Sequence, residues 1–271
     1  MIIDGRKLAA ERKEELKIER QKFGALSLGV VIATTSPVTQ SYVGIKKRAA
    51  TDLNIDVVEY RLPETATLEE IMNATKEAGK HDGVILQLPL PNGIDVDIAK
   101  NAIPTMLDVD VLSDPAFELF AQNNFPAIPP VPAAMWYIMK RNNVSIAGAN
   151  MVLIGGGRLV GKPAGVLFER LGANVRTLIK GDDVVSATRN ADIIISGAGV
   201  PALIKPDMIK DGVVIIDGGT SESGGMVVGD ADPLCAEKAS VFTPVPGGVG
   251  PIAVVEIFTN LLALKKLSIN L

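Results

Sequence analysis

The chain has 271 residues, which is enough for roughly two domains and a substantial buried core. Apolar residues make up 47% of it and charged residues 21%, so a disordered chain is excluded. The net charge of -4 leaves no basic surface for nucleic acid or for an anionic membrane, and we expect neither partner. The composition therefore favours a protein that acts on a small molecule.

Cysteine usage and the start of the chain bear on its compartment. Cys235 is the single cysteine, so neither an intrachain disulfide nor a Cys-x-x-Cys site can form. Residues 1–6 lack the basic start and the apolar run of a signal peptide, and no apolar stretch reaches membrane-spanning length. We expect a cytoplasmic protein.

His81 is the one histidine of the chain. This disfavours metal sites with several imidazole ligands and Ser-His-Asp hydrolysis, and we expect no metal. Because His81 stands in a polar stretch before an apolar strand, we interpret it as an ordinary loop residue. Acid–base chemistry then falls to lysine, aspartate, glutamate or tyrosine.

The first half of the chain alternates between helical and strand patterns. We expect a helix over 8–23, a buried strand over 28–33, a helix over 41–53, a strand over 56–61, a helix over 67–80 and a buried strand over 83–87. Thr67 and Glu70 have the spacing of a capping box at the start of the last helix. Repeated strand-helix-strand units predict a parallel sheet.

A second series follows a proline-rich interval at 126–132, which we interpret as a crossover between domains. It comprises a helix over 133–141, a strand over 150–154, a helix over 163–171, strands over 174–179, 192–196 and 213–217, and a closing apolar helix over 252–264. The predicted fold class is α/β with two domains. We expect an N-terminal parallel βα substrate domain at 1–125, completed by the returning helix at 252–271, and a Rossmann-type cofactor domain at 133–248.

A glycine-rich turn, Gly155 to Gly157, follows the strand at 150–154 and precedes Gly161 and a helix opened by Pro163. Here the backbone can approach a pyrophosphate closely, and helix N-terminal amides can meet its charge. Turns use glycine in any case, so a purely structural turn is the alternative, and the spacing is longer than in the common dinucleotide fingerprint. The residues that we expect to bind the cofactor are Gly155, Gly156, Gly157, Arg158, Val160, Gly161, Lys180, Gly197 and Thr220.

The charged residues after the strand at 174–179 bear on which cofactor binds. A basic side chain there suits the extra phosphate of NADP, whereas an acidic one suits the ribose of NAD. Lys180 lies nearest the expected position, with Arg176 before it, but Asp182 and Asp183 follow within three residues. We expect NADP, and NAD stays possible.

Tyr42 and Lys46 are four residues apart, which places both on one face of the predicted helix. A Tyr-x-x-x-Lys pair after a nucleotide-binding turn would indicate a short-chain dehydrogenase, but here the pair comes first. It therefore belongs to a different, substrate-binding domain. Taken alone, the pair is also explained as surface residues of an amphipathic helix.

Five segments, in order and across nearly the whole chain, resemble the bifunctional methylenetetrahydrofolate dehydrogenase and methenyltetrahydrofolate cyclohydrolase family. They are 41–46, 87–91, 108–110, 160–163 and 243–251. The resemblance implies that hydride passes from the methylene carbon of a reduced folate to NADP, and that water then opens the methenyl product to formyltetrahydrofolate in the same cleft. It also implies one-carbon metabolism with purine biosynthesis, and a homodimer.

The resemblance also assigns roles to the candidate catalytic residues. Lys46 matches the family's catalytic lysine, a candidate proton carrier. Gln87 matches the residue that hydrogen-bonds and orients this lysine. Tyr42 matches the ring that packs on the folate, and Asp110 the acid that pairs with the donor edge of the pterin. The loop expected to close over the substrate contributes Pro246, Gly247, Gly248 and Pro251.

The chain departs from the family's pattern at three places. Val111-Leu112 stand where the family has Gly-Phe, Pro130-Val131 where it has Cys-Thr, and Gly156-Gly157-Arg158 where an Arg-Ser pair is common. We expect both reactions to persist, because the four candidate catalytic residues are retained. The alternatives are a cyclohydrolase with weak or absent dehydrogenase activity and a non-catalytic folate-binding or nucleotide-binding protein.

Overall fold

The computed structural model describes residues 1–223 and 226–269. Within these residues the chain divides into two compact units. The unit that we call the N-terminal unit consists of Arg12–Pro130 and Val254–Leu271, and the central unit consists of Met1–Glu11 and Val131–Ala253. The helices α1 (Gly5–Arg20) and α9 (Val249–Ile269) contribute residues to both units.

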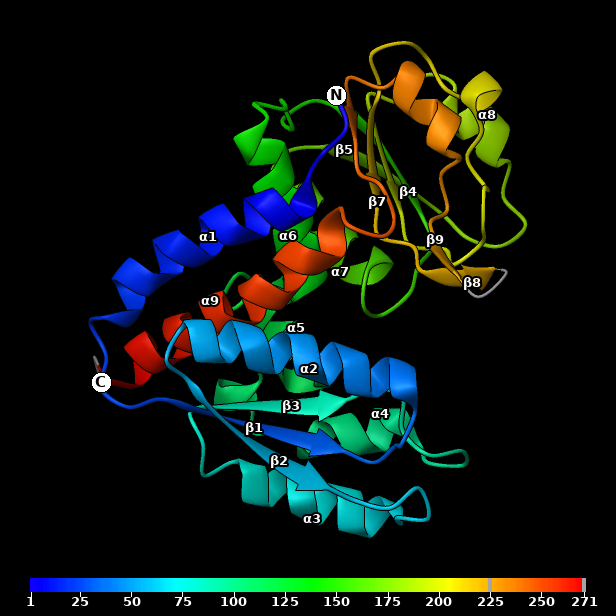
Figure 1. Cartoon of the computed structure of the whole chain (residues 1–271). Coiled ribbons are helices and arrows are strands. Elements are labelled where there is room, and N and C mark those ends of the chain that lie inside the picture. The colour runs from blue at the N-terminus through cyan, green and yellow to red at the C-terminus, as the bar shows by residue number, and fades with distance from the viewer. Residues whose placement is uncertain (224–225, 270–271) are drawn as a thin grey trace. The chain divides into compact units, whose positions relative to one another are not determined.

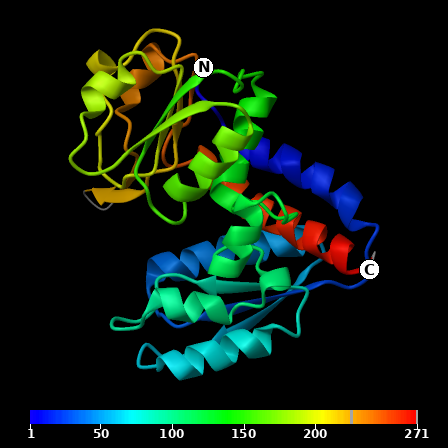
Figure 2. The ribbon, with the colours of Figure 1, turned by 180° about the vertical axis from the view of Figure 1, so that it is seen from behind.

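A parallel sheet with the strand order β2-β1-β3 forms the centre of the N-terminal unit. Its strands are β1 (Ser27–Ile32), β2 (Asp56–Arg61) and β3 (Gly83–Gln87). The connecting helices are α2 (Pro37–Asp52) and α3 (Leu68–Ala78). The two crossovers run in opposite directions along the sheet, and right-handed crossovers then place α2 and α3 on opposite faces, as Figures 1 and 2 show.

Burial explains this arrangement. Every residue of β3 is buried, as expected of a strand that is covered on both faces. Val31, Val84 and Leu86 pack with Ile71 and Ala78 of α3 in one hydrophobic cluster. The capping box predicted at Thr67 and Glu70 is present and fixes the start of α3.

The connection after β3 contains short helices and then approaches the sheet again. These elements are α4 (Val96–Ala99), two short 3-10 helices (Lys100–Ala102 and Thr105–Leu107) and α5 (Asp114–Ala121). A parallel bridge joins Asp108 to Val84 of β3. The segment that leads to Asp110 therefore runs beside β3 towards the end that carries Gln87.

The C-terminal part of α9 packs within the N-terminal unit, so the predicted return of the closing helix is confirmed. Lys265 Nζ lies 2.7 Å from Asp82 Oδ1. Asn260 Nδ2 donates a hydrogen bond of 2.8 Å to the carbonyl oxygen of Val109. Asn260 and Leu261 are both buried.

The central unit is built on a second parallel sheet with the strand order β10-β7-β6-β4-β5. Its main elements are α6 (Pro130–Arg141), β4 (Asn150–Ile154), α7 (Gly161–Arg170), β5 (Asn174–Leu178), α8 (Val184–Thr188), β6 (Ile193–Ser196), β7 (Val214–Asp217) and β10 (Val241–Phe242). Two short 3-10 helices (Pro206–Met208 and Pro233–Glu237) and a hairpin of β8 (Ser221–Ser223) with β9 (Met226–Val228) complete it. The order reverses between β4 and β6, which is where such sheets bind ligands.

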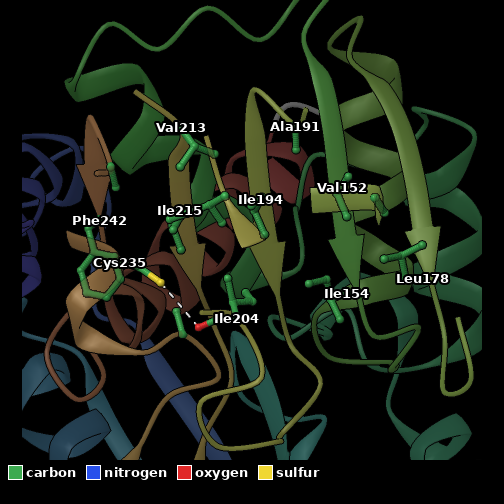
Figure 3. Packing of buried hydrophobic residues seen from close by; sticks show 14 residues of the cluster. Val152, Ile154, Leu178, Ala191, Ile194, Ile204, Val213, Ile215, Cys235 and Phe242 are labelled. Carbon is green, nitrogen blue, oxygen red and sulfur yellow. Dashed lines mark hydrogen bonds between the residues drawn. The ribbon is translucent and has the colours of Figure 1, made fainter. Parts of the chain in front are cut away.

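One hydrophobic face of this sheet is drawn in Figure 3. Val152, Ile194 and Ile215 come from the adjacent strands β4, β6 and β7 and lie on the same side. Cys235 is a buried member of this cluster and its thiol donates to the carbonyl oxygen of Ile204 at 3.5 Å. The cysteine is therefore a packing residue of the core.

The two-domain α/β fold class with parallel sheets is confirmed, but the crossover expected at 126–132 is shorter than predicted. Residues 130–132 open α6 instead of forming part of a crossover, because proline suits the first turn of a helix, where the amides have no partner. The first eleven residues group with the central unit and not with the sheet at 27–87. The amides of Ile3 and Gly5 donate to the carbonyl oxygens of Phe242 and Gly247, and these contacts could not be predicted from local pattern.

His81 lies in the turn after α3, where the sequence places it. Its ring nitrogens lie 3.0 Å from the hydroxyl oxygens of Tyr60 and Ser27. Among the helices in the described part of the chain, we find none with both the length and the apolar character needed to cross a bilayer.

Candidate functional site

In the N-terminal unit, Lys46 and Gln87 meet at the carboxyl end of β3. Lys46 extends from α2, and its Nζ donates a hydrogen bond of 2.9 Å to Gln87 Oε1. Gln87 Nε2 donates to the carbonyl oxygen of Leu88 at 2.7 Å. Gln87 is only 9% exposed, so its amide needs partners within the protein. The bond to Leu88 uses the amide nitrogen and leaves the amide oxygen facing the lysine.

Tyr42 lies one helical turn before Lys46, on the same face of α2. It is 43% exposed, so much of its ring remains accessible. An accessible aromatic face beside an amine is suited to stacking on a flat ring system.

Asp110 lies near enough to Lys46 for the two charges to interact. Burial raises the pKa of its carboxyl, and the positive charge of Lys46 opposes that rise. The next residue, Val111, has a φ of 52°. Glycine takes this left-handed conformation freely, whereas a β-branched residue is strained in it, so the departure at Val111 has a local cost. The structure thus brings Lys46, Gln87 and Asp110 together in one unit.

In the central unit, the glycines of the predicted cofactor turn fall into two groups. A Cβ at Gly161 would lie 1.7 Å from the carbonyl oxygen of Gly155, and a Cβ at Gly155 would lie 2.8 Å from that of Gly197. Gly157, by contrast, would meet no atom within 4 Å, and Gly156 only the end of the Ile179 side chain at 3.6 Å. Packing therefore requires Gly155 and Gly161, whereas Gly156 and Gly157 leave open space at the switch point of the sheet.

Val160 and Gly197 are part of the same packing. A Cβ at Gly197 would lie 2.5 Å from Val160 Cγ1, so the two residues bring the turn and the end of β6 into contact. Arg158 is partly buried within the turn, and Thr220 is exposed beyond the end of β7. The predicted cofactor residues from 155 to 161, with Gly197 and Thr220, therefore follow the carboxyl ends of β4, β6 and β7.

The charged residues after β5, which the sequence leaves ambiguous, have different surroundings. Asp182 Oδ2 accepts the amide of Ile179 at 2.7 Å, and Asp183 caps α8 by accepting the amide of Ser186 at 3.0 Å. Lys180 and Arg176 are exposed. The two acids thus stabilise the local backbone, and this leaves the basic side chains of Lys180 and Arg176 available to a ligand.

Sequence reasoning missed two buried carboxylates at the same edge, Asp217 and Asp230. Asp230 accepts hydrogen bonds from the Ser196 hydroxyl (2.7 Å) and from the amides of Ala198 (2.8 Å), Gly199 (3.2 Å) and Val200 (2.8 Å). Asp217 accepts from the amides of Gly219 (2.9 Å) and Ala231 (2.8 Å). An acid at the end of the apolar strand 213–217 was a usable signal for Asp217, whereas Asp230 has no comparable sequence context.

The loop with Pro246, Gly247 and Gly248 leads into α9, and Pro251 lies in the first turn of that helix. Gly247 has a φ of 106°, and its carbonyl oxygen accepts the amide of Gly5 at 2.9 Å. A Cβ at Gly248 would lie 2.6 Å from the carbonyl oxygen of Pro244. Tight turn geometry therefore accounts for both glycines, and contact with a substrate stays a prediction.

Comparison with known proteins finds one family that matches most of the chain. The family described as "Tetrahydrofolate dehydrogenase/cyclohydrolase, catalytic domain" matches residues 3–110, and its "NAD(P)-binding domain" matches residues 129–269. The chain is 35% identical to the bifunctional protein FolD of Aquifex aeolicus, over 98% of this chain and 95% of that relative.

Two solved structures are similar to this chain over nearly its full length. The FolD methylenetetrahydrofolate dehydrogenase/cyclohydrolase of Campylobacter jejuni has a TM-score of 0.91 at 31% identity and covers 98% of this chain and 99% of that chain. The Trypanosoma brucei enzyme, complexed with NADP and an inhibitor, has a TM-score of 0.92 at 28% identity and covers 100% of this chain and 99% of that chain.

A parallel sheet with an open glycine turn at its switch point, in a chain that also brings Lys46 and Gln87 together, is typical of the class of nicotinamide-dependent enzymes. Within that class, the chain belongs to the tetrahydrofolate dehydrogenase/cyclohydrolase family. The family predicted from the five sequence segments is confirmed.

The Asp217 carboxyl gives a pH-dependent prediction. Burial raises its pKa to about 6, whereas an unfolded aspartate titrates near 3.9. Between roughly pH 4 and pH 6 the folded state holds a proton that the unfolded state has lost, so this group lowers the free energy of unfolding as pH rises. Relative to Asp217→Asn, the wild type should lose about 3 kcal/mol over this range.

Urea unfolding at several pH values, followed by the fluorescence of Trp136 in the central unit, measures this difference. The control is Asp192→Asn. A hydrogen bond from Lys210 lowers the pKa of Asp192, so the wild type should gain stability over that variant as pH rises. Differences of the same sign for both variants would contradict the assignment.

Proposed function

We propose that the chain oxidises 5,10-methylenetetrahydrofolate with NADP and hydrolyses the resulting 5,10-methenyltetrahydrofolate to 10-formyltetrahydrofolate. The observation that carries this proposal is the hydrogen bond between Lys46 and Gln87 beside the half-buried carboxyl of Asp110. Lys46, Gln87 and Asp110 come from three of the five sequence segments that resemble the family.

Each residue of this site has a distinct proposed role. Asp110 accepts hydrogen bonds from the donor edge of the pterin, because a carboxylate can face two N–H groups at once. The exposed ring of Tyr42 packs on the flat part of the folate. Gln87 fixes the position of Lys46 Nζ through the bond of 2.9 Å.

Lys46 is the proposed proton carrier of the hydrolysis. Water adds to the methenyl carbon, and the proton that it releases passes to Lys46 Nζ. Lys46 Nζ then passes this proton to a ring nitrogen as the bond between that nitrogen and the carbon breaks. The remaining hydroxyl proton leaves to solvent as the C=O bond forms, which leaves the formyl group on the other nitrogen. A lysine held by a buried amide is suited to this task because its Nζ stays in one place during both transfers.

NADP, when bound, supplies the acceptor for the hydride of the methylene carbon. The residues of the central unit fit this cofactor. Gly156 and Gly157 leave the backbone open to a pyrophosphate at the start of α7. Lys180 provides positive charge for the additional phosphate, and the two acids beyond it are occupied by backbone amides.

The folate-binding role is proposed for residues 1–125 and 252–271, and the cofactor-binding role for 133–248. Pro246, Gly247, Gly248 and Pro251 are proposed to border the folate. We also propose a cytoplasmic homodimer without nucleic-acid or membrane partners that supplies formyl groups for purine biosynthesis. Following reduced cofactor and formyl product separately distinguishes the bifunctional enzyme from a cyclohydrolase with weak dehydrogenase activity and from a binding protein.

Replacing the proton carrier tests the hydrolysis. Lys46→Met should lower the cyclohydrolase rate by at least about 100-fold while folate still binds, because general acid–base catalysis contributes this much. The measurement is the loss of methenyltetrahydrofolate at saturating concentration. Lys47→Met is the matched control, since Lys47 pairs with Glu59 instead of Gln87. Full cyclohydrolase activity in Lys46→Met would rule out the role of this lysine.

Replacing Asp110 tests pterin recognition. Asp110→Ala removes a half-buried carboxylate acceptor, and we expect tetrahydrofolate to bind roughly 10-fold to 100-fold more weakly. Calorimetric titration under anaerobic conditions gives the dissociation constant. Asp52→Ala should leave it unchanged, because Asp52 pairs with Lys13 at an exposed position. An unaltered folate affinity of Asp110→Ala would be incompatible with pterin pairing.

Replacing Lys180 tests cofactor choice. Lys180→Ala should weaken NADP binding about tenfold and leave NAD binding unchanged, because only NADP carries the additional phosphate. Steady-state kinetics with each cofactor measure the change, and Lys205→Ala, another exposed lysine of the central unit, serves as control. Equal losses for both cofactors would argue against a phosphate contact.

A further inference from the structure

The turn that carries Asp110 is held by Asp108, a buried residue with no role in the proposed reaction. Asp108 is 0% exposed. Its Oδ1 accepts the amide of Leu112 at 3.1 Å and its Oδ2 accepts the amide of Ser113 at 2.8 Å. The carboxylate therefore fixes the backbone on the C-terminal side of Asp110.

Asn260 of α9 holds the other side of the same turn. It is 3% exposed, and its Nδ2 donates to the carbonyl oxygens of Val109 at 2.8 Å and Ile128 at 2.7 Å. Its Oδ1 accepts the amide of Ile128 at 3.1 Å. Both amide protons and the amide oxygen are thus used, and the residue before Asp110 is tied to a helix 151 positions away in the sequence.

This turn needs external support because of its own backbone. Val111 is buried and has a φ of 52°, a conformation that costs a β-branched residue free energy. Such a conformation persists only where the surroundings fix it. The hydrogen bonds at Val109, Leu112 and Ser113 flank Val111 on both sides and provide this restraint.

The two carboxyls of the turn are also electrostatically linked. Burial, opposed by hydrogen bonds from Ser113 and Leu112 and aided by the charge of Asp110, raises the pKa of Asp108 to about 6. A shift of the Asp108 carboxylate would therefore change the electrostatic environment of Asp110.

We propose that Asn260 and Asp108 are positioning residues for Asp110, through which α9 sets the affinity of this site for the pterin. The inference rests on the proposed function. Neither side chain needs to touch the substrate, because each acts through the backbone on one side of Asp110. Loss of either one should weaken folate binding only as long as the Asp110 carboxylate is present.

A double-mutant cycle tests this dependence. Tetrahydrofolate affinity is measured by anaerobic calorimetry for the wild type, Asn260→Leu, Asp110→Ala and the double variant. We expect Asn260→Leu to weaken binding about tenfold in the wild-type background and less than about twofold in the Asp110→Ala background. NADP affinity, measured in the same variants, should not change.

Lys265→Met is the matched control on the same helix. It removes the contact of α9 with Asp82 but touches neither Val109 nor Ile128. This variant should show wild-type folate affinity even if the unfolding temperature falls as far as in Asn260→Leu. A parallel loss of folate affinity in Lys265→Met would show that loosening of α9 suffices, and would overturn the positioning role.

The remaining outcomes are equally decisive. Wild-type folate affinity in Asn260→Leu, or an equal loss in both backgrounds, would overturn the inference and leave the proposed function intact. No tetrahydrofolate binding by the wild type would overturn the proposed function and the inference with it. If Asn260→Leu fails to fold, Asp108→Asn, which keeps the shape of the side chain, takes its place in the same cycle with the same expected result.

Discussion

Parallel strand pairing is the constraint on which the candidate residues of each unit depend. In a parallel sheet all strands end at the same edge, so loops from distant parts of the chain meet there. Gln87 ends β3 in the N-terminal unit, and the bridge between Val84 and Asp108 brings Asp110 to the same edge. In the central unit, the glycine turn and the loops at Gly197 and Thr220 follow β4, β6 and β7 in the same way.

Both edges are supported by carboxylates that bind no ligand in the proposed reaction. Asp108 orders the turn around Asp110, while Asp217 and Asp230 order the loops after β6 and β7. Burial raises the pKa of Asp108 and that of Asp217 to about 6, so ionising these groups in the folded protein costs free energy. Backbone amides offset this cost, and the result is a fixed loop geometry that short apolar side chains could not provide.

Charged residues near a cofactor cannot be assigned by position alone. Lys180, Asp182 and Asp183 lie within four positions of one another, and each type of charge suits a different nicotinamide cofactor. The two aspartates accept backbone amides, one in the turn after β5 and one at the start of α8. Asp182 and Asp183 therefore contribute to the local fold, and the proposed contact of Lys180 with the cofactor remains compatible with their positions.

The sequence by itself determined the strands at 56–61 and 83–87, the capping box at Thr67, the α/β class and the family, because these depend on local spacing and on motifs. It also indicated Lys46, Gln87 and Asp110 as candidates, although only through the joint pattern. The tertiary structure alone decided that Asn260 holds the turn of Asp110, that Asp230 gathers the amides after β6, and that the first eleven residues group with the central unit. Each of these contacts joins residues far apart in the sequence, and no local pattern specifies a partner that only folding brings near.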